Sequence, residues 1–329
     1  MKCINKRSLS MLLIAALIFG AISGGCKKEE ADTGTYRLYE TSYQYGLLHS
    51  ATLAESPLFA SDLCIPEDEN INVEELDTSG VKACGMFNGT TKETLYARDI
   101  YHKIYPASTT KIMTAYIALK YGDPDLKVTV SENALDIDPK SSVAGLKVGD
   151  QISIRQLLYG LMLVSGNDAA VAIAEGVGGS VESFVSLMNT EANALGATNT
   201  HYVNSNGLPS EDHYTTVYDM YLILNAASQM EAFTDIIKTT SYNASYESSS
   251  GATVTKTWNN TNRYLDGRAK APANVSIIGG KTGTTGQAGY CLCLLSRNEN
   301  NELILSFVFG AGSAGDLYYY MNNLLTKFA

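Results

Sequence analysis

The chain has 329 residues, of which 45% are hydrophobic and 18% are charged, so it can bury the core of one large domain or two. Its formal net charge is −10. Binding to a nucleic-acid backbone normally needs clustered Lys and Arg on a basic domain, so no nucleic-acid partner is expected.

Residues 1–25 have the pattern of a signal peptide. A positive start is followed by the apolar run MLLIAALIF (11–19), which is too short to span a bilayer comfortably. Small residues in SGGC lead to Cys26, which resembles the lipidated cysteine of a bacterial lipoprotein, although Ser23 is an unusual residue at its position. Cleavage after AIS (21–23) and an uncleaved membrane anchor are the alternatives. All three interpretations place the rest of the chain outside the cytoplasm.

Residues 26–80 are expected to form an anchor and an acidic tether, because KKEEADTGT is polar and PEDENINVEELDTSG is acidic and poor in apolar residues. No CxxC motif or Cys/His cluster is present, so no metal is expected. Cys291 and Cys293 are spaced i, i+2 and point to one side of a predicted strand. They fit a core as small apolar side chains. A Cys64–Cys84 disulfide remains open.

The domain expected over 81–329 begins with strands and continues with helices. KACGMFNGTTKETLYARD predicts two short strands around an Asn-Gly turn. YPASTTKIMTAYIALKYG (105–122) has apolar residues at helical spacing. SIRQLLYGLMLVSGNDAAVAIAEGVGG (153–179) predicts two buried helices broken at SGN, the first starting with a capping box of Ser153 and Gln156. SVESFVSLMNTEANALG and TTVYDMYLILNAAS predict two more helices.

Strands return in the last third of the chain. VSIIGGKTG, AGYCLCLLS and ELILSFVFG predict three strands, with RNENN (297–301) as the last turn. DLYYYMNNLLTKF predicts a helix whose apolar stripe packs on a sheet rather than on a membrane, because only one Lys flanks it. This order predicts an α+β domain. Its N- and C-terminal parts share one antiparallel sheet of about five strands, flanked by helices and a helical subdomain.

A serine and a lysine in the segment 105–122 suggest nucleophilic catalysis. Ser108 and Lys111 are i, i+3, so their side chains meet on one helical face. A serine hydroxyl needs a neighbouring base, and burial or a second cation can lower the pKa of lysine enough for that role. The S-x-N motif at Ser165–Asn167 falls in the break between two helices, and K-T-G at 281–283 occurs once. Neither a G-x-S-x-G motif nor a complete P-loop is present.

These three motifs in this order resemble the serine β-lactamase and penicillin-binding superfamily. YPASTTKIMTAY, LMLVSGNDAAVAIAE, NSNGLPSEDHYTTVYDM and NTNRYLDG…GGKTGTT are similar to the low-molecular-weight D-alanyl-D-alanine carboxypeptidases. The resemblance implies that superfamily's fold. It also implies an enzyme that removes the terminal D-Ala from peptidoglycan stem peptides ending in D-Ala-D-Ala. β-Lactams are then covalent inhibitors, and no cofactor is implied.

The resemblance implies three catalytic residues. Ser108 attacks the carbonyl between the two D-Ala residues and Lys111 takes its proton. Ser165 relays a proton to the departing D-Ala. The backbone N–H groups of Ser108 and Thr284 form the oxyanion hole, whose donors contribute ~3–4 kcal/mol to the transition state.

The resemblance also implies the substrate-binding residues. Asn167 holds the substrate amide, and Lys281 and Thr282 bind the terminal carboxylate. Gly283 lets the substrate lie against the strand edge.

Two further matches, His213 and Asp219, are expected to be structural. The acidic residue usual after K-T-G is Gln287 here, and no E-x-x-L-N is present to activate a deacylating water. Long-lived acylation by penicillin is therefore expected, and rapid β-lactam hydrolysis is not. A β-lactamase and a catalytically silent cell-wall-binding lipoprotein are the alternatives.

Overall fold

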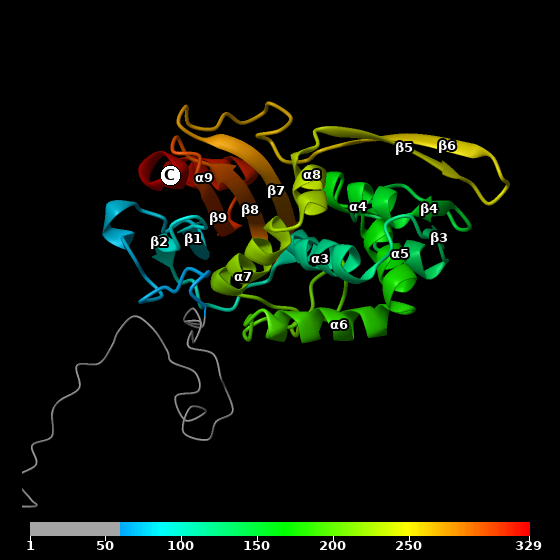
Figure 1. Ribbon diagram of the computed structural model, residues 1–329, viewed down its shortest axis with the longest axis horizontal. Helices are drawn as coiled ribbons and strands as arrows, with labels where there is room; N and C mark the ends of the chain where they lie inside the picture. Colours follow the sequence, from blue (N-terminus) through cyan, green and yellow to red (C-terminus); the bar gives the residue numbers. More distant parts are fainter. Residues whose placement is uncertain (1–59) are drawn as a thin grey trace, which may run out of the picture. The chain divides into compact units, whose positions relative to one another are not determined.

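The computed structural model describes residues 60–329, and a compact unit runs from Asp62 to Ala329 (Figure 1). The expected signal peptide, the Cys26 lipidation site and most of the tether lie outside the described residues. The helices are α3 (Lys111–Tyr121), α4 (Ile154–Leu163), α5 (Asn167–Gly178), α6 (Val181–Ala194), α7 (Val217–Ser228), α8 (Glu231–Lys238) and α9 (Ala314–Phe328), with short 3₁₀ turns η1 (Val73–Glu75), η2 (Ala107–Thr110) and η3 (Asn133–Leu135).

Two antiparallel sheets are present in this unit. The first has the order β2-β1-β9-β8-β7 and the second the order β3-β4-β5-β6. The strands are β1 (Ala83–Asn88), β2 (Glu93–Arg98), β3 (Lys127–Thr129), β4 (Gln151–Ser153), β5 (Ser241–Glu247), β6 (Thr253–Asn259), β7 (Ser276–Thr285), β8 (Gly289–Arg297) and β9 (Leu303–Ala311).

The five-stranded sheet joins the two ends of the domain, as predicted. β1 pairs with β9 in a register that sets Ala83 opposite Phe309. α9 packs on one face of this sheet, and α3 and α7 lie on the other face (Figure 1). The apolar stripe of α9 is buried against the sheet at Leu317, Met321 and Leu324, which confirms the predicted packing. β8 is apolar on both faces because both faces are covered.

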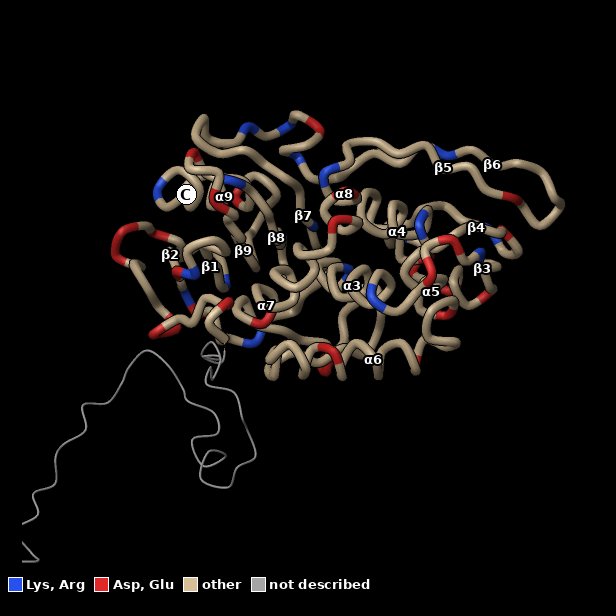
Figure 2. Tube along the Cα trace, viewed as in Figure 1, with Lys and Arg blue, Asp and Glu red and all other residues tan. Residues whose placement is uncertain are grey.

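The segment 62–80, which the composition assigned to the tether, packs on the domain. The Cys64 N–H donates to Tyr221 Oη at 2.7 Å, and Tyr218 Oη donates to the Cys64 carbonyl at 3.0 Å. Ile71 forms an antiparallel bridge with Ala97 on β2. The acidic residues of this segment are exposed, and their positions along the chain lie beside β2 (Figure 2). This exposure explains why the composition of the segment suggested a solvated linker. The domain therefore begins before residue 80.

The thiols of this domain are free and buried. Cys64 belongs to the core on the α3 side of the sheet and Cys84 to the core on the α9 side, so the sheet separates them and the disulfide left open by the sequence does not form. Burial raises the pKa of Cys84 and of Cys291 to about 12, which keeps both protonated.

The sequence analysis did not predict the β5–β6 hairpin or the second sheet. The hairpin extends away from the five-stranded sheet, beside α4 (Figure 1).

The sequence also predicted a complete capping box at α4, and only half of it forms. Ser153 Oγ accepts from the Gln156 N–H at 3.3 Å, but the Gln156 side chain donates to the Ser245 carbonyl on the hairpin instead. None of the described helices is, alone, long and apolar enough to cross a membrane.

Candidate active site

The turn that carries Ser108 is a 3₁₀ helix, η2, directly before α3. A 3₁₀ helix has three residues per turn, so side chains at i and i+3 eclipse. This geometry places Lys111 Nζ 3.1 Å from Ser108 Oγ. The Ser108 side chain caps neither helix, because no side-chain capping bond is made at η2 or at α3.

The amine of Lys111 is fully buried and has three partners. Besides Ser108 Oγ, it donates to Asn167 Oδ1 at 2.7 Å and to the Asn206 carbonyl at 2.6 Å. No carboxylate forms an ion pair with it among the described residues. Burial and the nearby Lys281 ammonium lower the pKa of Lys111 well below its ordinary value, while Asp168 raises it. The side chain therefore does not extend to solvent, and burial favours its neutral form more than in an exposed lysine.

The nucleophile turn is held between two glycines. At Gly207, which has φ +90°, a Cβ would lie 1.9 Å from the Ala107 carbonyl oxygen. At Gly283 on β7, a Cβ would lie 3.0 Å from the backbone nitrogen of Ser108. Gly283 thus allows β7 to approach η2. This is a second role for the glycine, because the resemblance implies only that it lets the substrate lie against the strand edge. Ala107 itself has φ +49°, a conformation that costs a non-glycine residue energy.

Ser165 and Asn167 lie in the break between α4 and α5, as predicted. Ser165 has φ +60°, and its hydroxyl makes no hydrogen bond within the described part of the chain. Asn167 begins α5, and its Oδ1 accepts from Lys111. The structure therefore links Ser108 and Asn167 through Lys111. Ser165 lies two residues before Asn167 in the same break, and no hydrogen bond joins its hydroxyl to these three side chains.

The buried carboxylate of Asp168 fixes the loop opposite. It accepts the backbone N–H groups of Ala144, Gly145 and Leu146 at 2.7, 2.8 and 3.0 Å. The neighbouring Asn167 N–H donates to the Ser142 carbonyl at 2.8 Å. Charge-assisted bonds of this kind are the stronger hydrogen bonds in proteins. One wall of the site is thereby attached to the start of α5.

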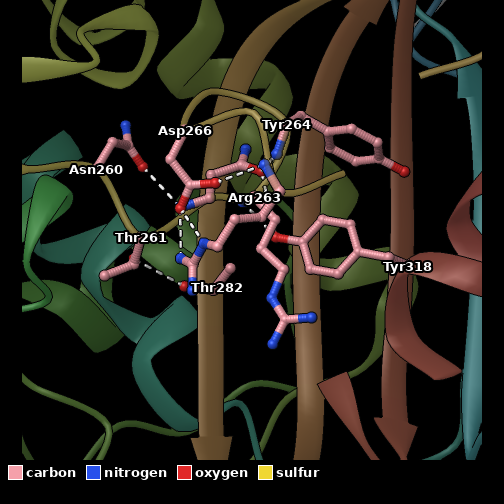
Figure 3. Close-up of polar contacts among 9 residues, drawn as sticks. Asn260, Thr261, Arg263, Tyr264, Asp266, Thr282 and Tyr318 are labelled. Carbon is pink, nitrogen blue, oxygen red and sulfur yellow. Dashed lines mark hydrogen bonds and ion pairs between the residues drawn. The ribbon is translucent and has the colours of Figure 1, made fainter. Parts of the chain in front are cut away.

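Lys281 lies on β7 and is 1% exposed. Its Nζ donates to the Thr282 carbonyl at 2.8 Å, and burial lowers its pKa to about 7. Thr282 Oγ1 lies 3.2 Å from Thr261 Oγ1, on the loop 260–270 that runs beside β7 (Figure 3). Lysines on an edge strand are usually exposed to solvent, so the burial of Lys281 indicates a role beyond ending the strand.

The loop 260–270 is stabilised by its own polar contacts. Asp266 pairs with Arg268, and the Arg263 N–H donates to Tyr318 Oη at 2.8 Å (Figure 3). Tyr318 Oη also donates to Asn262 Oδ1 at 3.3 Å. These contacts join the loop to α9 and hold Thr261 against Thr282.

His213 contacts the nucleophile turn at Thr110, and its hydrogen bonds fix one tautomer of the ring. The Val203 N–H donates to its Nδ1 at 3.1 Å, so the proton is on Nε2, which lies 2.8 Å from Thr110 Oγ1. Burial, with His201 and Lys111 nearby, lowers the pKa of His213 to about 4. Asp219 accepts from Thr200 Oγ1 at 2.7 Å and from the Asn199 N–H at 2.8 Å. Both residues have the structural surroundings that were expected.

A cavity of about 380 Å³ opens at the nucleophile. Its walls are Ser108, Asn167, the loop at Asp138–Ser142, the turn at Asn206–Pro209 and the end of β7 at Thr284–Gly286. Sequence reasoning gave no role to Asn206, Asp168 or Thr261. A backbone carbonyl such as that of Asn206 leaves no side-chain signal in a sequence.

These features are typical of a serine hydrolase in which a buried lysine, rather than a histidine, lies beside the serine hydroxyl. Residues 73–313 match the sequence profile of the peptidase S11 family, D-alanyl-D-alanine carboxypeptidase. The chain belongs to this family. It is 38% identical over 237 residues to the D-alanyl-D-alanine carboxypeptidase of Streptomyces sp. (strain K15), covering 69% of this chain and 79% of the relative.

Further comparisons agree with this assignment. The chain is 33% identical over 237 residues to the D-alanyl-D-alanine carboxypeptidase DacF of Bacillus subtilis, but it spans only 58% of that relative's length. The crystal structure of the Streptomyces K15 DD-transpeptidase superimposes with a TM-score of 0.70 at 32% identity, over 75% of this chain and 96% of the other. The predicted α+β fold with a five-stranded sheet is confirmed.

Proposed function

We propose that this protein is a serine-type D-alanyl-D-alanine carboxypeptidase that removes the terminal D-Ala of peptidoglycan stem peptides through an acyl-enzyme on Ser108. The observation that carries this proposal is the set of three partners around Lys111 Nζ. Two of them, Asn167 Oδ1 and the Asn206 carbonyl, are obligatory acceptors. A neutral amine has two N–H donors for these acceptors, which leaves its lone pair toward the Ser108 hydroxyl.

Acylation then follows from this arrangement. Lys111 takes the Ser108 proton while Oγ attacks the scissile carbonyl, and the backbone N–H groups of Ser108 and Thr284 stabilise the oxyanion. The side-chain NH₂ of Asn167 holds the substrate amide, because its Oδ1 is used by Lys111. The hydroxyl of Ser165 relays the proton held by Lys111: it gives its own proton to the leaving D-Ala nitrogen and regains one from the Lys111 ammonium, which returns that amine to its neutral form. Water then hydrolyses the ester and restores Ser108.

The leaving residue has its own subsite. The terminal carboxylate binds the Lys281 ammonium and the Thr282 hydroxyl, and Thr261 extends this polar wall. Gly283 brings β7 against η2, so the two oxyanion donors lie on elements in contact. β-Lactams acylate Ser108 by the same steps.

The experiment is mass spectrometry after incubation with a pentapeptide ending in D-Ala-D-Ala. Loss of one D-Ala from the peptide supports the proposal. Transfer of the acyl group to an added amine would instead show a transpeptidase, as the superimposed Streptomyces K15 protein is named.

A labelled penicillin tests for a β-lactamase and for a catalytically silent protein. Stable labelling supports the carboxypeptidase, fast turnover means a β-lactamase, and absence of labelling means a silent protein. Ser108→Ala should abolish labelling while the protein stays folded by circular dichroism, and labelling that persists would refute the nucleophile.

We also propose that the protein works outside the cytoplasm, attached to the membrane by a lipid on Cys26. The support is the N-terminal sequence alone, in which small residues after an apolar run end at a cysteine.

A further inference from the structure

The cavity at Ser108 lies on one side of the nucleophile. Along β7 it is lined by Thr284–Gly286 and not by Lys281 or Thr282, which precede them. If the leaving D-Ala occupies the Lys281–Thr282 end, as proposed above, the cavity receives the acyl half of the peptide. The residue directly before the scissile D-Ala has its Cα only ~3.8 Å further along the chain, so its side chain is within reach of this cavity.

Two oppositely charged side chains line the far wall of the cavity. Asp138 and Lys140 both line it, and both are exposed. Neither forms a salt bridge within residues 60–329. One carboxylate oxygen of Asp138 accepts the Lys140 backbone N–H at 2.9 Å, which fixes the turn and leaves the other oxygen free. Among the residues that the structure describes, the site therefore presents one carboxylate oxygen and one ammonium that pair with no other charged side chain.

The wall that carries them is held in place. Its continuation at residues 142–146 is attached to Asp168 and Asn167 by the backbone bonds described above, and the Trp258 indole N–H donates to the Ala144 carbonyl at 3.0 Å. The opposite wall contains Leu208 and Pro209, which give methylene groups an apolar surface. An extended aliphatic side chain with a charged end thus fits between them.

We propose that Asp138 and Lys140 form a specificity subsite for a stem-peptide residue whose side chain ends in both an ammonium and a carboxylate, a diaminodicarboxylic acid. This inference rests on the proposed function. Asp138 binds the ammonium, Lys140 binds the carboxylate, and Leu208 and Pro209 contact the methylene chain. A lysine side chain would satisfy only Asp138, and an acetylated lysine would satisfy neither.

Three N-acetylated peptides ending in D-Ala-D-Ala test the subsite, with meso-diaminopimelate, lysine or Nε-acetyl-lysine in the preceding position. D-Ala release at low ionic strength gives kcat/KM for each. We expect the diaminopimelyl peptide to exceed the acetyl-lysyl peptide by about tenfold, the range of two exposed ion pairs, and salt to reduce the difference by screening.

Variants assign the two charges. Asp138→Asn should lower the ratio of lysyl to acetyl-lysyl kcat/KM by about threefold to fivefold, and Lys140→Gln should lower the ratio of diaminopimelyl to lysyl by a similar factor. Asp136→Asn and Lys147→Gln make the same charge changes in the same loop outside the cavity and should leave both ratios as in the parent protein.

Equal kcat/KM for the three peptides, or equal ratios in Asp138→Asn and Asp136→Asn, would overturn the subsite while leaving the carboxypeptidase proposal intact. If no D-Ala is released from any of the three peptides, the proposed function itself fails, and the subsite fails with it.

Discussion

The backbone of Gly207 meets the carbonyl of Ala107 so closely that a single methyl group would not fit between them. This contact fixes the position of the Ser108 turn relative to the segment that carries Gly207. Gly207→Ala should destabilise the protein by roughly 1–3 kcal/mol and reduce penicillin acylation, because the turn must move. Gly267→Ala is a matched control, since Gly267 also has a positive φ but nothing within 4 Å of its Cβ position. Chemical denaturation and labelling rates measure both, and equal effects in the two variants would contradict the close-contact explanation.

Removal of the lysine base should separate chemistry from stability. Lys111→Met should slow acylation by about 10²–10⁴-fold, the usual range for a general base. Its free energy of unfolding should change by no more than about 1–3 kcal/mol, because relief from burying the amine offsets the loss of a donor for Asn167 Oδ1 and the Asn206 carbonyl. Stopped-flow acylation with a fluorescent penicillin is the measurement, and Lys120→Met, on the exposed side of α3, is the control. An unchanged acylation rate would exclude Lys111 as the base.

The pH dependence of peptide hydrolysis should report Lys281. Its pKa is about 7, so its positive charge is present below that pH and lost as the pH rises through it. Because kcat/KM reports groups of the free enzyme, kcat/KM for a peptide with a free carboxylate should fall above about pH 7. In Lys281→Arg the guanidinium stays protonated, and this alkaline fall should disappear. A fall at the same pH in the variant would assign it to another group.

Acid should destabilise the fold through His213. The pKa of His213 in the folded state is about 4, below the ordinary value of 6.5, so the unfolded chain binds the extra proton first. Stability is then complete above about pH 6.5 and is lost as the pH falls toward 4, by roughly 3 kcal/mol if the full difference applies. Urea denaturation across this range should show a steeper loss in the parent protein than in His213→Gln. Parallel curves would mean that other groups dominate.

The proposed lipid anchor depends on a single thiol. In a bacterial host, the chain should incorporate labelled palmitate and sediment with membranes, and Cys26→Ser should lose both properties. Cys3→Ser tests the specificity of the label, because Cys3 lies in the proposed signal peptide. Palmitate incorporation that survives in Cys26→Ser would contradict the assignment of the lipid to this thiol.

Much of the fold could be predicted from the sequence because its core elements are strongly periodic. The broken helix pair and the C-terminal helix carry long apolar patterns, and each was found. The β5–β6 hairpin was not, although Tyr242, Ala244 and Tyr246 alternate in β5, because polar residues fill the positions between and around them. The segment 62–80 was misassigned because a few buried residues, Cys64 among them, attach an otherwise acidic stretch.

The site was predictable where side chains carry the chemistry. Ser108, Lys111 and Asn167 come together as the motifs indicate. The bond from Lys111 to the Asn206 carbonyl and the contact of Gly207 with Ala107 depend on the path of the backbone. That path could not be predicted from the sequence. Asp168 was overlooked because its partners are backbone N–H groups of a distant loop.

The pairing of β1 with β9 also has a consequence for biogenesis. The central strands of the sheet come from opposite ends of the domain, with Ala83 opposite Phe309, so the sheet cannot close until nearly the whole polypeptide is available. Pairings between such distant residues form slowly. A nascent chain of this design stays unfolded for longer, and that delay fits the export across the membrane that is proposed above, because a translocation pore passes an unfolded chain.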